Sequence, residues 1–239
     1  MPSKTVVISS RDLLARLSGA SADPCVLDQT LTFLGYAGQT LTPEMVGRIG
    51  EAIEEVEKVA RPLASVSTFA ADEVPLELEG RDIQDHLAGA CQVVLVAATL
   101  GAGVDAELRR LKVCDPVGQV LFDAAASAYI ERVMDVLEAD IRNQAQQEGL
   151  YCGWRFSPGY GDFPLSVQPR LLAVLDASRR LGITLSESYL MVPTKSVTAI
   201  IGKHPTPQEG LAKTCSICSL SRFCSMRSRG VTCARKRGQ

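Results

Sequence analysis

The spacing of apolar residues along the chain predicts several amphipathic helices. Thr42, Pro43 and Glu44 supply a cap residue, a proline in the first turn and an early acid, which are typical of a helix start. Asp115 and Pro116 begin another helix in the same way, and apolar residues recur at helical spacing from there to Gly149. The helices predicted from these signals cover 26–36, 43–61, 82–87, 104–113 and 116–149.

Short apolar runs predict strands over 63–69, 74–78 and 91–98. The stretch Leu87–Val104 has eighteen residues without a charge, which is nearly the length of a membrane-spanning helix. Its glycines and short apolar run fit a buried central strand and a turn better, and no membrane segment is expected. The glycine-rich turn 99–103 lacks a full dinucleotide or P-loop pattern, so tight packing is expected there. This order of elements predicts an α+β (mixed α/β) fold, with a central mixed sheet and flanking helices.

The most informative block runs from Arg155 to Gly202. It opens with Arg155, whose planar guanidinium is a two-pronged donor suited to a ligand carboxylate. Pro158 and Gly159 bend the chain so that backbone groups can approach a ligand closely, and Tyr160 adds a flat face with a polar tip. Taken alone, the element is also compatible with an ordinary turn that carries a surface arginine. Apolar residues at helical spacing follow over 171–181, and then strand-like sequences at 185–193 and 196–198.

In order, spacing and residue types, this block resembles the activation domain of cobalamin-dependent methionine synthase. The resemblance reaches more weakly into the preceding helix, where Asp123 takes the place of an acid that contacts the nucleoside end of the ligand. An acid favoured by the dipole in the first turn of a helix is the alternative explanation of Asp123. The resemblance implies a site for S-adenosylmethionine beside a corrinoid, and its ligand contacts would be Arg155, Phe156, Ser157, Pro158, Gly159, Tyr160 and Asp123.

The resemblance ends after Pro205, which divides the chain into an activation-like domain at 1–205 and a tail at 206–239. The family continues with further aromatic and helical sequence, whereas this chain continues with a small cysteine-rich segment. Four thiolates are enough to hold one metal centre, and so short a polar segment cannot bury a core of its own. The spacing of the four cysteines favours an iron–sulfur cluster, which could also supply the electron that corrinoid reactivation needs. Zinc is the alternative. The metal ligands predicted are Cys215, Cys218, Cys224 and Cys233.

The resemblance implies a free-standing relative of the activation domain, which supports reductive reactivation and remethylation of a corrinoid protein or of a cobalamin-dependent methionine synthase. S-adenosylmethionine would be the methyl donor, cobalamin would reside on the partner, and an electron-donor protein would be a further partner. The alternative is a non-catalytic docking or assembly module for a corrinoid protein, with a zinc-binding tail. The chain has two histidines and no Gly-x-Ser-x-Gly element, so it offers no hydrolytic triad.

Composition and charge indicate which classes of partner and which cellular compartment to expect. The 239 residues carry a formal net charge of −2, yet the seven Lys and Arg residues from Lys213 onward are accompanied by no acid. Because the body is acidic, nucleic acid is not an expected partner for it. The apolar run 6–8 is too short for a secretory signal, so we expect a cytoplasmic protein whose eight cysteines are thiols or metal ligands.

Overall fold

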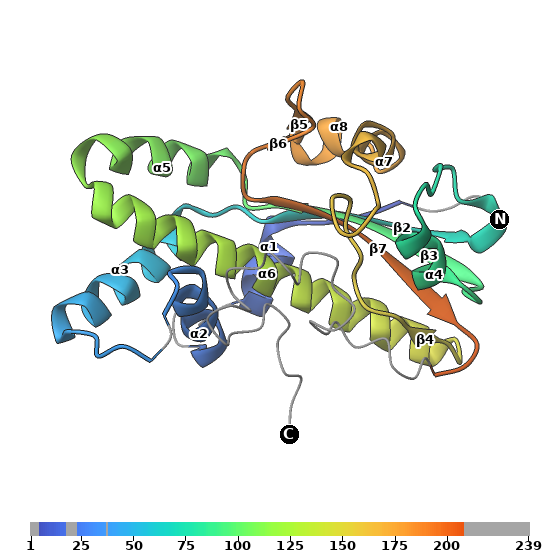
Figure 1. Ribbon diagram of the computed structural model, residues 1–239, viewed down its shortest axis with the longest axis horizontal. Helices are drawn as coiled ribbons and strands as arrows, with labels where there is room; N and C mark the ends of the chain where they lie inside the picture. Colours follow the sequence, from blue (N-terminus) through green and yellow to red (C-terminus); the bar gives the residue numbers. More distant parts are fainter. Residues whose placement is uncertain (1–4, 18–22, 37, 208–239) are drawn as a thin grey trace.

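The computed structural model describes residues 5–17, 23–36 and 38–207, and a five-stranded sheet forms its centre (Figure 1). Each neighbouring pair of strands is antiparallel, so the α+β class is confirmed while the expected mixed sheet is wrong. Strands β3 and β4 run in the same direction, but β7 lies between them and pairs with both. The strand order is β1 (Val6–Ile8), β2 (Leu63–Ala70), β3 (Gln92–Thr99), β7 (Ser196–His204) and β4 (Tyr151–Cys152).

One face of the sheet packs against a layer of helices that is dominated by α6 (Figure 1). With 32 residues, α6 spans about 48 Å and therefore extends beyond the eight-residue strand β3. Every second residue of β3 enters this core, namely Val94, Val96 and Ala98. The helices of the layer are α1 (Ser10–Leu17), α2 (Pro24–Phe33), α3 (Pro43–Val59), α5 (Ala102–Cys114) and α6 (Pro116–Gln147).

The opposite face carries a second core that is built from shorter elements and loops. The alternate residues Val93, Leu95 and Ala97 of β3 point into it. Because β3 is buried on both faces, its sequence is a continuous apolar run rather than an alternating one. The elements that contribute residues to this core are α4 (Arg81–Leu87), η3 (Leu165–Val167), α7 (Gln168–Val174), α8 (Ala177–Leu181) and the hairpin β5 (Thr184–Leu185) with β6 (Met191–Val192). The short helix η2 (Ala71–Glu73) follows β2.

The predicted helix starts and the glycine-rich turn are confirmed. Thr42 Oγ1 accepts from the backbone N–H of Met45 at 3.2 Å, and Asp115 Oδ1 accepts from that of Gly118 at 3.0 Å. A Cβ at Gly103 would lie 2.8 Å from the carbonyl oxygen of Val59, so the turn is glycine-rich because the backbones approach closely. Among the described helices, none is long and apolar enough to span a bilayer.

Two expectations about the second face are wrong. The segment 74–78 forms no strand, because no strand lies beside it; side chains bind its backbone instead, with Arg170 Nε donating to Pro75 O at 3.1 Å. The apolar sequence at 171–181 forms two short helices rather than one. Asp176, with φ of 51°, interrupts it, and Ser65 Oγ donates to the carbonyl of Leu175 at the end of α7 at 3.0 Å.

Candidate functional site

Arg155 lies on an edge segment that continues β4 along β7. After the pairing of Cys152 with Lys203, the backbone groups of Phe156 and Ile200 exchange hydrogen bonds at 2.9 and 2.7 Å. The side chains of Trp154 and Phe156 pack into the core of the second face. Because neighbouring residues of an extended chain point to opposite sides, Arg155 is directed to the other layer, toward α6.

On α6, Arg155 meets three carboxylates. Its Nη2 atom lies 3.2 Å from Glu131 Oε2 and 3.0 Å from Asp135 Oδ1, and its Nε atom lies 3.2 Å from Glu138 Oε2. The guanidinium side chain is 17% exposed, and the three acid side chains are 34%, 26% and 3% exposed in the same order. The remaining nitrogen, Nη1, is buried and has no hydrogen-bond partner among the described residues. Within the described part of the chain, the cluster thus leaves one buried donor group without an acceptor.

The acids of this cluster compete for the positive charge of Arg155. Burial raises the pKa of Asp135, and the charge of Arg155 counteracts this in part. The neighbouring carboxylates of Glu131 and Glu138 raise the pKa of Asp135 further, because like charges disfavour its ionised form. Sequence reasoning missed these three acids as part of the site. Their spacing of four and three residues within one helix was the available signal, since it places them on one side of α6.

The turn after Arg155 exposes backbone and an aromatic ring. Pro158 is buried and Tyr160 is 41% exposed, and the N–H of Gly159 donates to the carbonyl of Phe163 at 2.8 Å. Gly159 has a φ of 90°, a conformation that glycine adopts without strain. The turn is anchored by Asp162, whose carboxylate accepts the backbone N–H groups of two residues at the start of α4, at 2.7 and 3.0 Å. These hydrogen bonds lower the pKa of Asp162.

Asp123 lies on α6 away from the Arg155 cluster. It is the eighth residue of the helix, so the expectation that it could be a first-turn acid is wrong. Its carboxylate is half-exposed and forms an ion pair with Lys195 Nζ at 2.8 Å, and Lys195 also donates to Ser127 Oγ at 2.8 Å. Eight residues separate Asp123 from Glu131, or about 12 Å along the helix axis. The structure therefore places Asp123 on the same helix as the three acids that contact Arg155, but about two turns away from them and not in contact with Arg155.

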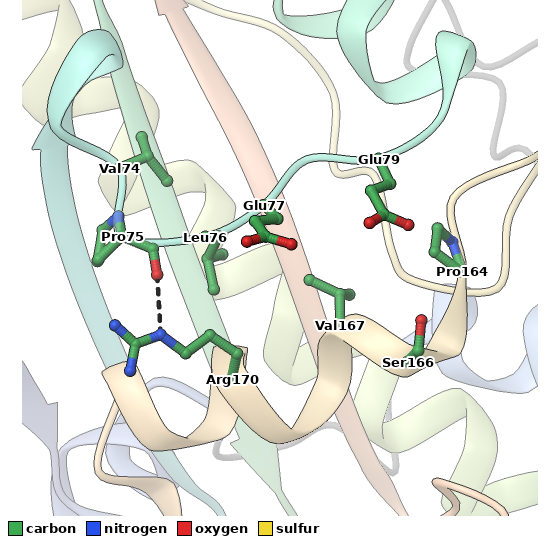
Figure 2. Close-up of a pocket in the computed structure, with 9 residues that line it drawn as sticks. All are labelled: Val74, Pro75, Leu76, Glu77, Glu79, Pro164, Ser166, Val167 and Arg170. Atoms are coloured by element: carbon green, nitrogen blue, oxygen red, sulfur yellow. Dashed lines mark hydrogen bonds between the residues drawn. The ribbon is translucent and has the colours of Figure 1, made fainter.

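The remaining predicted residues lie elsewhere, and so does a cavity in the second face. Cys215, Cys218, Cys224 and Cys233 fall outside the described residues, and within the described ranges no group of three or more metal-ligating side chains occurs. A cavity of about 660 Å³ lies between the segments 74–79 and 164–170. Figure 2 shows Arg170 directed toward the carbonyl of Pro75, while the carboxylates of Glu77 and Glu79 lie further along segment 74–79. None of the residues 155–160 lines this cavity.

The fold matches that of a known reactivation domain. A solved structure titled "Crystal Structure of the MetH Reactivation Domain bound to AdoHcy" superposes with a TM-score of 0.59 and 18% sequence identity, covering 97% of this chain and 87% of that one. Residues 83–213 match the family model described as "Vitamin B12 dependent methionine synthase, activation domain". The chain therefore belongs to this activation-domain family. No curated protein matches the sequence significantly.

Proposed function

We propose that this chain binds S-adenosylmethionine at the Arg155 element and presents it to a corrinoid-carrying partner for reductive remethylation. Family membership supports the role in reactivation, and the solved structure with the same fold is titled as a complex with AdoHcy, the demethylated product of that donor. The partner is a cobalamin-binding domain or a corrinoid protein, and an electron-donor protein supplies the reducing equivalent.

One observation carries the assignment of the ligand site. Arg155 Nη1 is a charged donor that is buried without a hydrogen-bond partner among the described residues. Such a group costs free energy unless a further acceptor satisfies it. The carboxylate of an amino-acid ligand is an acceptor of the right charge and geometry, since it takes two parallel hydrogen bonds from a guanidinium.

The other residues of the element have distinct proposed roles. Glu131 and Asp135 are partly exposed, so they are the acids that a ligand carboxylate displaces from Nη2 or that receive the ligand's ammonium group. The turn over Ser157, Pro158 and Gly159 lets its backbone groups approach the ligand, and the exposed ring of Tyr160 covers it. Phe156 is buried and acts by holding the segment against β7. Asp123, about 12 Å further along α6, would face the nucleoside end.

The chain contributes orientation rather than acid–base chemistry. The corrinoid, when bound to the partner, supplies the cobalt that accepts the methyl group after one-electron reduction. Holding the sulfonium methyl in line with that acceptor makes a bimolecular displacement effectively unimolecular, and S-adenosylhomocysteine leaves as the product. No proton moves in this displacement, so the site needs no general base.

The cysteine tail is proposed to hold an iron–sulfur cluster that passes the electron to the partner. The proposal rests on the sequence alone, in which four cysteines fall within nineteen residues. Three arginines in the same segment, Arg222, Arg227 and Arg229, would offset part of the negative charge of the thiolates. A zinc site formed by the same cysteines is the alternative.

Calorimetry with S-adenosylmethionine tests the ligand site. Arg155→Ala should weaken binding by about ten- to a hundredfold, because a hydrogen bond to a charged group contributes about 1.5–3 kcal/mol. Arg155→Lys should recover only part of this loss, since an ammonium cannot make the two-pronged contact. Arg170→Ala, which removes an arginine at the separate cavity, is the matched control and should bind normally. Equal affinities for Arg155→Ala and the wild type would contradict the assignment.

A further inference from the structure

Glu138 and Arg142 link α6 to the edge segment that carries Arg155. Glu138 Oε1 accepts hydrogen bonds from Arg142 Nε at 3.1 Å and Nη2 at 2.6 Å, while Oε2 lies 3.2 Å from Arg155 Nε. Arg142 donates from Nη1 to the carbonyl of Cys152 at 2.9 Å and from Nη2 to that of Gly153 at 2.7 Å. The two side chains therefore hold both the backbone that leads to Arg155 and the guanidinium itself.

Glu138 differs from the two other acids of the cluster in depth and in the atom it contacts. Its side chain is 3% exposed, whereas those of Glu131 and Asp135 are 34% and 26% exposed. Glu138 contacts Nε, next to the hydrocarbon stem of Arg155, while the other two contact Nη2. Because a guanidinium is planar, fixing Nε together with Nη2 also fixes the direction of Nη1. Nη1 is the nitrogen that has no partner among the described residues.

The charges of this network explain why Glu138 remains in place. A buried carboxylate is costly unless it is paired and its lone pairs are satisfied. Both oxygens of Glu138 face guanidinium groups, one from Arg142 and one from Arg155. A ligand carboxylate that reaches the cluster can therefore displace the more exposed Glu131 or Asp135 from Arg155, whereas the buried Glu138 stays in contact with it.

We propose that Glu138 and Arg142 are positioning residues, which orient the guanidinium of Arg155 toward the carboxylate end of the ligand without touching the ligand. This inference rests on the ligand site proposed above. It predicts a selective effect: changes at Glu138 affect only ligands that possess the carboxylate. S-adenosylmethionine and its decarboxylated analogue share the adenosine, the sulfonium and the amino group, so they form a matched pair of probes.

The test is calorimetry of the full chain with both probes, and the single tryptophan, Trp154, reports folding by its fluorescence. Glu138→Gln should weaken the binding of S-adenosylmethionine by about two- to tenfold, which is the contribution of one ordinary hydrogen bond. The affinity for the decarboxylated analogue should not change. Adding Glu138→Gln to Arg155→Ala should cause no further loss, because the two residues act through one contact. Arg142→Lys retains the charge but loses the forked contacts, so it should show the same selectivity and decides the test if Glu138→Gln does not fold.

Asp140→Asn is the control, because it neutralises an acid on the same helix that pairs with Arg16 rather than with Arg155, and it should weaken the binding of neither probe. A similar loss for both probes in Glu138→Gln would show a purely structural role and overturn the inference. An equal loss of affinity in Asp140→Asn would overturn it as well, and so would unchanged S-adenosylmethionine binding in Glu138→Gln when Arg155→Ala binds weakly. If Arg155→Ala itself binds normally, the proposed ligand site fails and the inference fails with it.

Discussion

Low pH should destabilise this protein through His86, which packs against the two residues that flank Arg155 in the chain. Its ring is 3% exposed and lies 4.6 Å from that of Trp154 and 5.2 Å from that of Phe156, measured between centroids. Neither ring nitrogen has a hydrogen bond of standard geometry among the described residues. Burial lowers the pKa of His86 from 6.5 to about 4; the charge of His204 adds to this, and the nearby Trp154 carbonyl opposes it.

The sign and the size of the effect follow from this pKa. Above pH 6.5 the imidazole is neutral in both the folded and the unfolded chain, so His86 does not make stability depend on pH. Between pH 6.5 and about 4 the unfolded chain binds a proton that the folded chain does not, so the free energy of unfolding falls. At about 1.36 kcal/mol per pH unit, the loss should be about 2 kcal/mol at pH 5 and about 3 kcal/mol at pH 4.

The assay is urea unfolding at pH 7 and pH 5, followed by the fluorescence of Trp154. His86→Phe keeps an aromatic ring against Trp154 and Phe156 but cannot bind a proton, so it is the comparison variant. Between the two pH values the wild type should lose about 2 kcal/mol more stability than the variant, since the carboxylates titrate in both proteins. Parallel losses in the two proteins would refute the reasoning, because they would show that His86 is not held neutral by burial.

Three further predictions concern Asp123, the turn after Arg155 and the tail. Asp123→Asn should lower the free energy of unfolding by at most about 1 kcal/mol, because the ion pair of Asp123 with Lys195 is half-exposed. It should weaken the binding of S-adenosylmethionine in calorimetry, and an unchanged affinity would remove Asp123 from the site. Gly161→Ala should lower the melting temperature more than Gly149→Ala. Both glycines have positive φ, but of the two only Gly161 lacks room for a Cβ, which would clash with Asp82 Oδ2. Equal losses would mean that Asp82 moves aside. Cys218→Ser should abolish metal binding and reduction of a partner's corrinoid while S-adenosylmethionine still binds; loss of both activities would make the tail a support for the ligand site. A brown protein with an absorption band at about 400 nm after anaerobic purification would indicate an iron–sulfur cluster. A colourless protein with stoichiometric zinc would indicate the zinc site instead.

Local sequence signals identified much of the fold because they depend on neighbouring residues alone. The caps at Thr42 and Asp115 and the apolar run of β3 are of this kind. The segment 74–78 has the composition of a strand, but a strand also needs a partner, and that is decided by residues far away in the chain. The break at Asp176 likewise involves a long-range contact, between Ser65 and the end of α7.

For the candidate site, the family and the role of Arg155 and its turn could be predicted from the sequence, because these residues stand close together and keep a characteristic spacing. The surroundings of Arg155 could not be predicted in this way, because they depend on how distant segments pack together. Glu131, Asp135 and Glu138 precede it by 17 to 24 residues, and they reach it because the chain reverses at the end of α6 and returns along the sheet edge. Burial depends on the same packing of the layers. It lowers the pKa of His86, and it holds Glu138 between Arg142 and Arg155, which limits how the guanidinium of Arg155 can turn toward a ligand.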